Sequence, residues 1–114
     1  MLANTRSAVL KLEIISSIAT KLAVDCFVAC ETWFGDRHSQ EFTSIPDFTT
    51  FRGDRQGRSG GGVAIWTRDS LHADEIAIHN KPQDIEIVGV EFLPNICLFG
   101  LYIPPALLPY PLVI

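Results

Sequence analysis

The chain has 114 residues, of which 47% are hydrophobic, and its formal net charge is −4. This length corresponds to about one domain, and the apolar content excludes an intrinsically disordered chain. The negative charge excludes a protein that binds nucleic acid through overall basicity.

An amphipathic helix is predicted near the N-terminus, in segment 7–22. Its apolar residues recur at spacings of four, three, four and three, which places them on one helical face. They are Ala8, Leu12, Ile15, Ala19 and Leu22. Thr5 or Ser7 can cap the first turn, and the apolar stripe predicts that the helix packs on a sheet.

A buried strand, Cys-Phe-Val-Ala-Cys, is predicted at 26–30 and runs directly into Glu31. Cys26 and Cys30 are four residues apart, so they point to the same face of the strand, and we interpret them as core thiols. The chain has three cysteines, an odd number without the spacing of a zinc site. This pattern indicates a reducing compartment.

Apolar and β-branched runs predict further strands at 49–52, 63–67, 71–78, 85–92 and 96–103. A flexible glycine-rich loop is expected at 53–62, and segment 71–78 is expected to be an edge strand. The last two strands are joined by Leu-Pro-Asn, which is typical of an antiparallel hairpin. The pattern predicts the α/β class, as part of a layered α/β sandwich. The sheet should be mostly antiparallel or mixed, with one long N-terminal helix.

No targeting segment is predicted. Charged residues interrupt the N-terminal apolar stretch, which a secretory signal would not tolerate. Segment 93–114 is uncharged and long enough to span a bilayer, but prolines break it repeatedly. We expect an intracellular protein, nuclear or cytoplasmic, that is not secreted and has no membrane partner.

Glu31 is the first candidate for chemistry, because it ends a buried strand, where open α/β sheets place their ligands. Mg²⁺ favours one or two carboxylates together with water and phosphate oxygens. A solvated residue at a strand end is the alternative interpretation.

The glycine-rich segment 58–66, Arg-Ser-Gly-Gly-Gly-Val-Ala-Ile-Trp, is the second candidate. Glycine loops can wrap phosphates with backbone N–H groups. Here no lysine follows the glycines and a strand rather than a helix comes next, so a plain hairpin loop is the simpler interpretation.

Arginines form the third candidate. Segment 52–68 holds four of them and one aspartate, a local charge of +3 in an acidic chain. They are Arg52, Arg55, Arg58 and Arg68. Guanidinium groups match phosphate geometry, so the strip either contacts a nucleic-acid backbone or is a solvated surface.

Tyr102 is the fourth candidate, because its phenol ends a predicted strand and can donate to a phosphate oxygen. Taken alone, it is more simply interpreted as a rim aromatic. His38, His72 and His79 lack metal-site spacing and are interpreted as surface residues.

The order of the motifs is more informative than any single one. Asn-Thr-Arg-Ser (4–7) precedes Cys-Glu-Thr-Trp (30–33), then come Phe-Arg-Gly-Asp-Arg (51–55) with Gly-Gly-Gly-Val-Ala (60–64), and finally Leu-Tyr-Ile-Pro-Pro (101–105). This succession resembles the endonuclease/exonuclease/phosphatase superfamily. In particular it is similar to the apurinic-type endonuclease domain of non-LTR (LINE-like) retrotransposons.

The resemblance implies Mg²⁺-dependent hydrolysis of DNA phosphodiester bonds, with Mn²⁺ as an alternative ion. Asn4 matches the asparagine that helps hold the phosphate and metal region, and Glu31 matches the metal-binding glutamate. Tyr102 matches the tyrosine that contacts the scissile phosphate. Arg52 and Arg55 match a segment that we interpret as mainly structural.

Arg52, Arg55 and Arg58 remain the candidate contacts to phosphate or DNA. In retrotransposons the nick primes reverse transcription. The implied partners are therefore DNA and a downstream reverse transcriptase domain of the same polyprotein.

The chain also departs from the family pattern. The 114 residues contain neither the later Gly-Asp-Phe-Asn motif nor the Ser-Asp-His motif, and Ile103 replaces the usual arginine. We therefore expect residues 1–105 to be a truncated domain, 106–114 to be an atypical apolar tail, and the chain alone to be inactive. A truncated sandwich leaves one face of a sheet without the layer that should cover it. That apolar face should promote self-association.

Two alternatives to an endonuclease part stay open. The first is a non-catalytic remnant or binding module. Within the superfamily, a phosphoesterase acting on a lipid or inositol phosphate is the other possibility.

Overall fold

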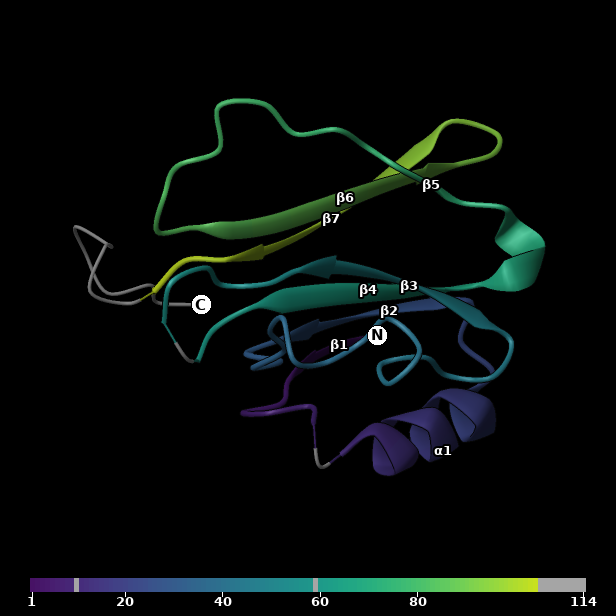
Figure 1. Ribbon diagram of the computed structural model, residues 1–114. Coiled ribbons are helices and arrows are strands. Elements are labelled where there is room, and N and C mark those ends of the chain that lie inside the picture. The colour runs from purple at the N-terminus through teal and green to yellow at the C-terminus, as the bar shows by residue number, and fades with distance from the viewer. Residues whose placement is uncertain (10, 59, 105–114) are drawn as a thin grey trace, which may run out of the picture.

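Two β-sheets and one α-helix make up the computed structural model, which describes residues 1–9, 11–58 and 60–104 (Figure 1). The strands are β1 (Leu2–Asn4), β2 (Cys26–Cys30), β3 (Phe48–Gly53), β4 (Val63–Arg68), β5 (Asp74–Glu75), β6 (Glu86–Phe92) and β7 (Ile96–Tyr102). The helix α1 spans Leu12–Leu22, and a 3₁₀ turn η1 spans Asp69–Leu71. The first sheet has the order β1-β2-β4-β3 and the second has the order β5-β6-β7.

Strand directions confirm the predicted mixed, mostly antiparallel pairing. β1 runs parallel to β2, whereas the β2–β4 and β3–β4 pairs are antiparallel. In the second sheet β6 pairs antiparallel with both β5 and β7. The predicted hairpin is therefore β6–β7, and its register brings Phe92 opposite Ile96.

The first core cluster lies between α1 and one face of the first sheet. Ile15 and Ala19 of the helix pack with Phe27 of β2 and Trp66 of β4. The rings of Phe27 and Trp66 stack with centroids 4.9 Å apart. Since aromatic side chains bury the most area per residue, this stack anchors the helix to the sheet.

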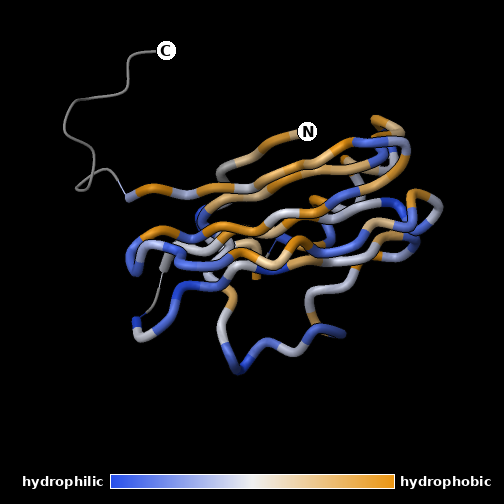
Figure 2. Tube along the Cα trace, turned by 90° about the horizontal axis from the view of Figure 1, so that it is seen from above, coloured by the Kyte–Doolittle hydropathy of each residue, from blue (hydrophilic) through white to orange (hydrophobic). Residues whose placement is uncertain are grey.

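The second core cluster lies between the two sheets. Val28, Val63 and Ile65 of the first sheet pack with Val88 and Val90 of the second. Successive strand residues point to opposite faces, so β2 and β4 contribute to both clusters. This is why their sequences are almost continuously apolar. Figure 2 shows hydrophobic colour along several of the extended segments.

The helix begins later than predicted. It starts at Leu12 rather than near residue 7, because the chain before it is tied to the end of β2. The amide of Ser7 donates to the Glu31 carbonyl over 2.7 Å, and that of Ala8 donates to the Thr32 carbonyl over 2.9 Å. Neither Thr5 nor Ser7 caps the helix, and its N-cap position has no side-chain hydrogen bond.

Other sequence predictions need smaller corrections. Of the predicted helical stripe, Leu22 is exposed. The edge strand expected at 71–78 is reduced to β5, whose two residues are both acidic and exposed. Cys26 and Cys30 are half-buried rather than in the core, because their side of β2 lines an open apolar groove of about 420 Å³ beside β7.

The expected α/β class with one N-terminal helix is confirmed, and the complete layered sandwich stays a prediction. Within the described residues no helix is both long and apolar enough to cross a membrane. The predicted tail, 106–114, lies outside the described residues.

Candidate active site

Glu31 lies where the sequence predicted it, directly after the carboxyl end of β2 in the first sheet. Because β1 and β2 are parallel, Asn4 ends its strand at the same edge, in register with Cys30. Glu31 is half-buried and has a left-handed backbone with φ of 55°. Residues other than glycine adopt this conformation only where surrounding contacts impose it.

Tyr102 brings the second sheet to this carboxylate. Its hydroxyl donates a hydrogen bond to Glu31 Oε1 over 2.8 Å, joining residues 71 positions apart. Burial raises the pKa of the Tyr102 phenol, and the hydrogen bond to Glu31 and its negative charge raise it further. The phenol therefore stays protonated at neutral pH and remains a donor.

Cys30 lies beside the same carboxylate. Burial raises the pKa of its thiol, and the nearby charge of Glu31 adds to the effect. Its Sγ lies 3.8 Å from the Leu101 carbonyl oxygen. A thiol with a raised pKa is a poor nucleophile, so the arrangement does not support thiolate chemistry.

Arg52 has a structural role. Its guanidinium donates to Asp54 at 2.5 Å and to the carbonyls of His38 at 2.6 Å and Gly35 at 3.1 Å. It also lies 5.1 Å from the centroid of the Phe34 ring. These bonds hold the loop after Glu31 against β3, as the resemblance implied for this segment.

Arg55 is also turned toward the protein. Its Nε donates to Glu86 Oε1 over 2.8 Å, and its guanidinium carbon lies 5.8 Å from the centroid of the Tyr102 ring. Glu86 is only 3% exposed. The same Glu86 oxygen accepts the backbone N–H of Gly62 over 2.9 Å.

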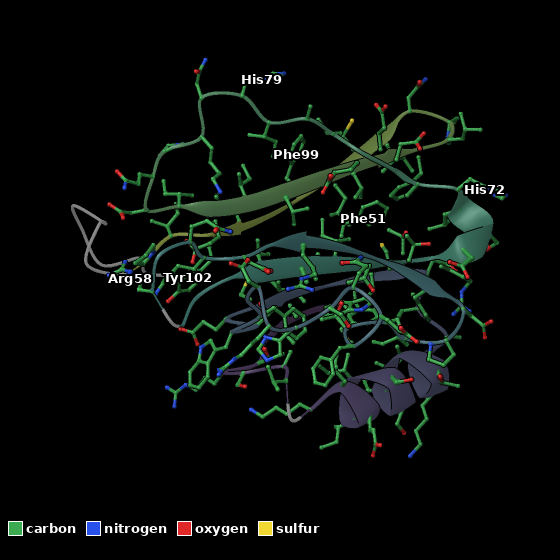
Figure 3. All side chains as sticks on the ribbon, viewed as in Figure 1. Phe51, Arg58, His72, His79, Phe99 and Tyr102 are labelled. Carbon is green, nitrogen blue, oxygen red and sulfur yellow. The ribbon has the colours of Figure 1, made fainter. Side chains whose placement is uncertain are left out.

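The remaining arginines do not form one strip. Arg58 is exposed and lies at the same end of the molecule as Tyr102 (Figure 3). Arg68 ends β4, away from the glycine loop, where it donates to the Val24 carbonyl and pairs with Asp25. The structure therefore separates Arg68 from the candidate site.

The glycine-rich loop is hydrogen-bonded to the residues around Glu31 and does not project freely into solvent. Gly61 and Gly62 are buried, and their carbonyls accept the amides of Trp33 at 2.9 Å and Thr32 at 3.4 Å. The N–H of Gly62 is committed to Glu86. The loop thus supports the two residues that follow Glu31, and the interpretation of the segment as a free hairpin loop is corrected.

Sequence reasoning missed Glu86. Strand alternation places it on the same face as Val88 and Val90, both buried. A charge in an inward register position was the available signal, because a buried carboxylate requires partners.

The histidines are dispersed. His38 Nδ1 accepts the Gly35 amide over 3.0 Å, while His72 and His79 lie in other parts of the molecule (Figure 3). No group of three or more His, Cys, Asp or Glu residues within the described part of the chain is arranged to hold a metal ion. The single Glu31 carboxylate fits a hard ion such as Mg²⁺, which completes its shell with water and phosphate oxygens.

No protein-family model matches the chain, and no curated protein matches it. Among solved structures the chain is similar to AP endonuclease LMAP from Leishmania major, with a TM-score of 0.66 and 14% identity. The match covers 90% of this chain and 39% of that one. A second similar structure is D. rerio TDP2 complexed with single strand DNA product (TM-score 0.48, 15% identity, 88% of this chain and 42% of that one).

At this level of identity the likeness establishes the fold. The described residues have the fold of an endonuclease/exonuclease/phosphatase-type protein, which confirms at fold level the resemblance found in the motifs. The chain spans less than half the length of the AP endonuclease chain that it matches.

Proposed function

We propose that this chain is the N-terminal part of a Mg²⁺-dependent DNA endonuclease domain, of the kind that nicks the target of a non-LTR retrotransposon. The observation that carries the proposal is the 2.8 Å hydrogen bond from Tyr102 to Glu31, formed between two motifs of the family pattern. The motif order supports the retrotransposon branch over a lipid or inositol phosphate phosphoesterase.

Glu31 is proposed to hold the divalent ion, Mg²⁺ or Mn²⁺. It is half-buried at a sheet edge, with its carboxylate oxygen accepting only a neutral donor in the contacts described. When bound, such an ion supplies charge stabilisation to a phosphoryl centre and activates water. The side chain of Glu31 contributes the fixed negative charge that selects a cation at this edge.

Tyr102 is proposed to orient the phosphate. A phenol has one proton, so it can donate to the Glu31 carboxylate or to a phosphate oxygen but not to both. A cation held by Glu31 would compete with the Tyr102 hydroxyl for the carboxylate, and the Tyr102 proton would then be available to a phosphate oxygen. The raised pKa of Tyr102 keeps that proton in place at neutral pH.

Other residues are assigned smaller parts. Asn4 ends β1 at the same sheet edge as Glu31 and is proposed to help hold the phosphate. Arg58, which is exposed at the Tyr102 end, is proposed to contact the DNA backbone. Arg52 and Arg55 make internal ion pairs, so any contact they make to phosphate is secondary to these.

We further propose that the 114-residue chain does not turn over DNA alone. Its sequence contains neither the Gly-Asp-Phe-Asn nor the Ser-Asp-His motif. In the resembled family these motifs activate water and orient the phosphate. Positioned general bases contribute factors of about 10² to 10⁴ in rate, so a site without one is slow.

A nicking assay on supercoiled plasmid tests the proposal, run beside binding of a labelled DNA duplex. The purified chain, shown to be folded, is measured with Mg²⁺, with EDTA and as Glu31→Ala. We expect no nicking, but duplex binding that Mg²⁺ strengthens and Glu31→Ala weakens. Nicking lost in both controls would overturn the proposed inactivity, and a folded chain with no Mg²⁺-dependent DNA binding would favour a non-catalytic remnant.

A further inference from the structure

Glu86 is a buried carboxylate that the mechanism above does not use. It begins β6 with only 3% exposure. One oxygen, Oε1, accepts both the Arg55 Nε and the Gly62 N–H, at 2.8 and 2.9 Å. A buried charge is costly unless it is paired and hydrogen-bonded, and these two donors meet that requirement.

One branch from Glu86 leads to Glu31 through the glycine loop. Gly62 donates to Glu86, and its carbonyl accepts the amide of Thr32, the residue after Glu31. A side chain at Gly61 would overlap the carboxylate of Glu86 and the guanidinium of Arg55. Glycine therefore lets the loop close on Glu86, and the loop then fixes the backbone at the end of β2.

The other branch leads to Tyr102. Glu86 and Tyr102 are directly opposite each other in the β6–β7 register, so both side chains leave the sheet on the same face. Arg55, held by Glu86, lies 5.8 Å from the centroid of the Tyr102 ring. Cation–π contact favours the ring position in which the hydroxyl reaches Glu31.

Both branches start at one carboxylate and end on the two members of the proposed site. Resting on the proposed function, we propose that Glu86 is the positioning residue of this site. Through Gly62 it sets the backbone beside Glu31, and through Arg55 it sets the ring of Tyr102. It touches neither substrate nor ion.

The test reads the Glu31–Tyr102 pair directly in metal-free protein. In a Tyr110→Phe background Tyr102 is the only tyrosine, so the ¹³Cζ resonance of its ring reports the hydroxyl alone. We measure the change in that resonance on Glu31→Gln, with and without Glu86→Gln. Glutamine keeps an oxygen for Gly62 but removes the charge that holds Arg55.

We expect Glu31→Gln to shift the Tyr102 resonance in the parent chain and to shift it much less when Glu86→Gln is present. Glu91→Gln is the matched control, since Glu91 lies on the same strand but is exposed, and it should leave the response intact. A full response in folded Glu86→Gln, or the same loss in Glu91→Gln, would overturn the proposal.

Arg55→Lys provides a second variant if Glu86→Gln fails to fold. Lysine keeps the opposite charge for Glu86 but has no planar guanidinium to lie on Tyr102. The coupling between Glu31 and Tyr102 should again shrink, and an unchanged coupling would overturn the Arg55 branch and with it the proposal.

Mn²⁺ binding, followed by water proton relaxation, separates this proposal from the proposed function. We expect Glu86→Gln to weaken Mn²⁺ binding by about tenfold. Loss of a group that orients a metal ligand without touching the ion has an effect of this size in other metalloproteins. If the parent chain binds no Mn²⁺ at Glu31, the proposed function fails, while the metal-free coupling still decides the role of Glu86.

Discussion

At the scale of residues, the site depends on one hydrogen bond between the ends of two sheets. Glu31 accepts it from Tyr102, and the backbone of Glu31 is left-handed at this point. The sequence indicated both residues separately. Their contact could not be predicted from either motif, because it depends on how closely the second sheet approaches the first.

The pKa of the Cys30 thiol responds to the charge of the neighbouring Glu31. Burial and the charge of Glu31 both raise the pKa of its thiol, so less thiolate is present at a given pH and alkylation is slowed. Glu31→Gln removes the charge but not the burial. We therefore expect iodoacetamide to label Cys30 faster in Glu31→Gln. The labelling rate still increases with pH, but its midpoint should lie at a lower pH than in the parent chain.

The labelling is measured in a variant in which the other two cysteines are serine. The Glu91→Gln change serves as control, because it removes a carboxylate on an exposed part of β6. An unchanged Cys30 rate in Glu31→Gln would show that the charge of Glu31 does not reach the thiol.

At the scale of elements, several strands could be predicted and the connections between them could not. The apolar run at Cys26–Cys30 predicted β2 to the residue, because an interior strand buried on both faces leaves a continuous signal. The helix start was misplaced, because bonds from Ser7 and Ala8 to the end of β2 override local periodicity. Glu86 was missed because its partners are distant in sequence.

The glycine loop is the element whose geometry is most exacting. Gly62 has φ of +88°, and a Cβ there would lie 2.6 Å from Thr32 Oγ1. Gly57, in the same loop, has φ of +81° with nothing within 4 Å of such a Cβ. The two glycines therefore share the backbone requirement and differ in the space around them.

We expect Gly62→Ala to lower the free energy of unfolding by about 2–3 kcal/mol, from the left-handed backbone together with the steric overlap. Gly57→Ala should cost about 1 kcal/mol, from the backbone alone. Urea unfolding monitored by tryptophan fluorescence measures both. Equal losses for the two variants would contradict the close packing of Gly62 on Thr32.

At the scale of the whole molecule, the second sheet ends in an uncharged strand. β7 is the last strand in the order of its sheet, and its sequence, Ile-Cys-Leu-Phe-Gly-Leu-Tyr, has no charged residue. Phe99 and Leu101 are each about half exposed. Uncharged edge strands and contiguous apolar surface favour association between chains.

We expect the isolated chain to self-associate, with a weight-average mass that rises with concentration in sedimentation equilibrium. Phe99→Lys, which places a charge on β7, should shift the chain toward monomer. Leu93→Lys is the matched control, since Leu93 is 84% exposed and lies in the turn before β7. A monomeric parent chain at all concentrations would contradict the prediction.

The fold class and the order of motifs were accessible from the sequence. The chain covers 39% of the AP endonuclease chain whose fold it shares. We therefore propose a site rather than a complete catalyst, in which Glu31, the hydrogen-bond acceptor of Tyr102, holds a divalent cation.

Paramagnetic broadening by Mn²⁺ tests that claim most directly. In ¹⁵N and aromatic ¹³C spectra of the chain titrated with Mn²⁺, we expect selective broadening of the Glu31 and Thr32 amides and of the Tyr102 ring. Glu31→Ala should abolish it, and Glu91→Ala should leave it unchanged. Broadening centred elsewhere, or unaffected by Glu31→Ala, would contradict the assignment of Glu31 as the metal ligand.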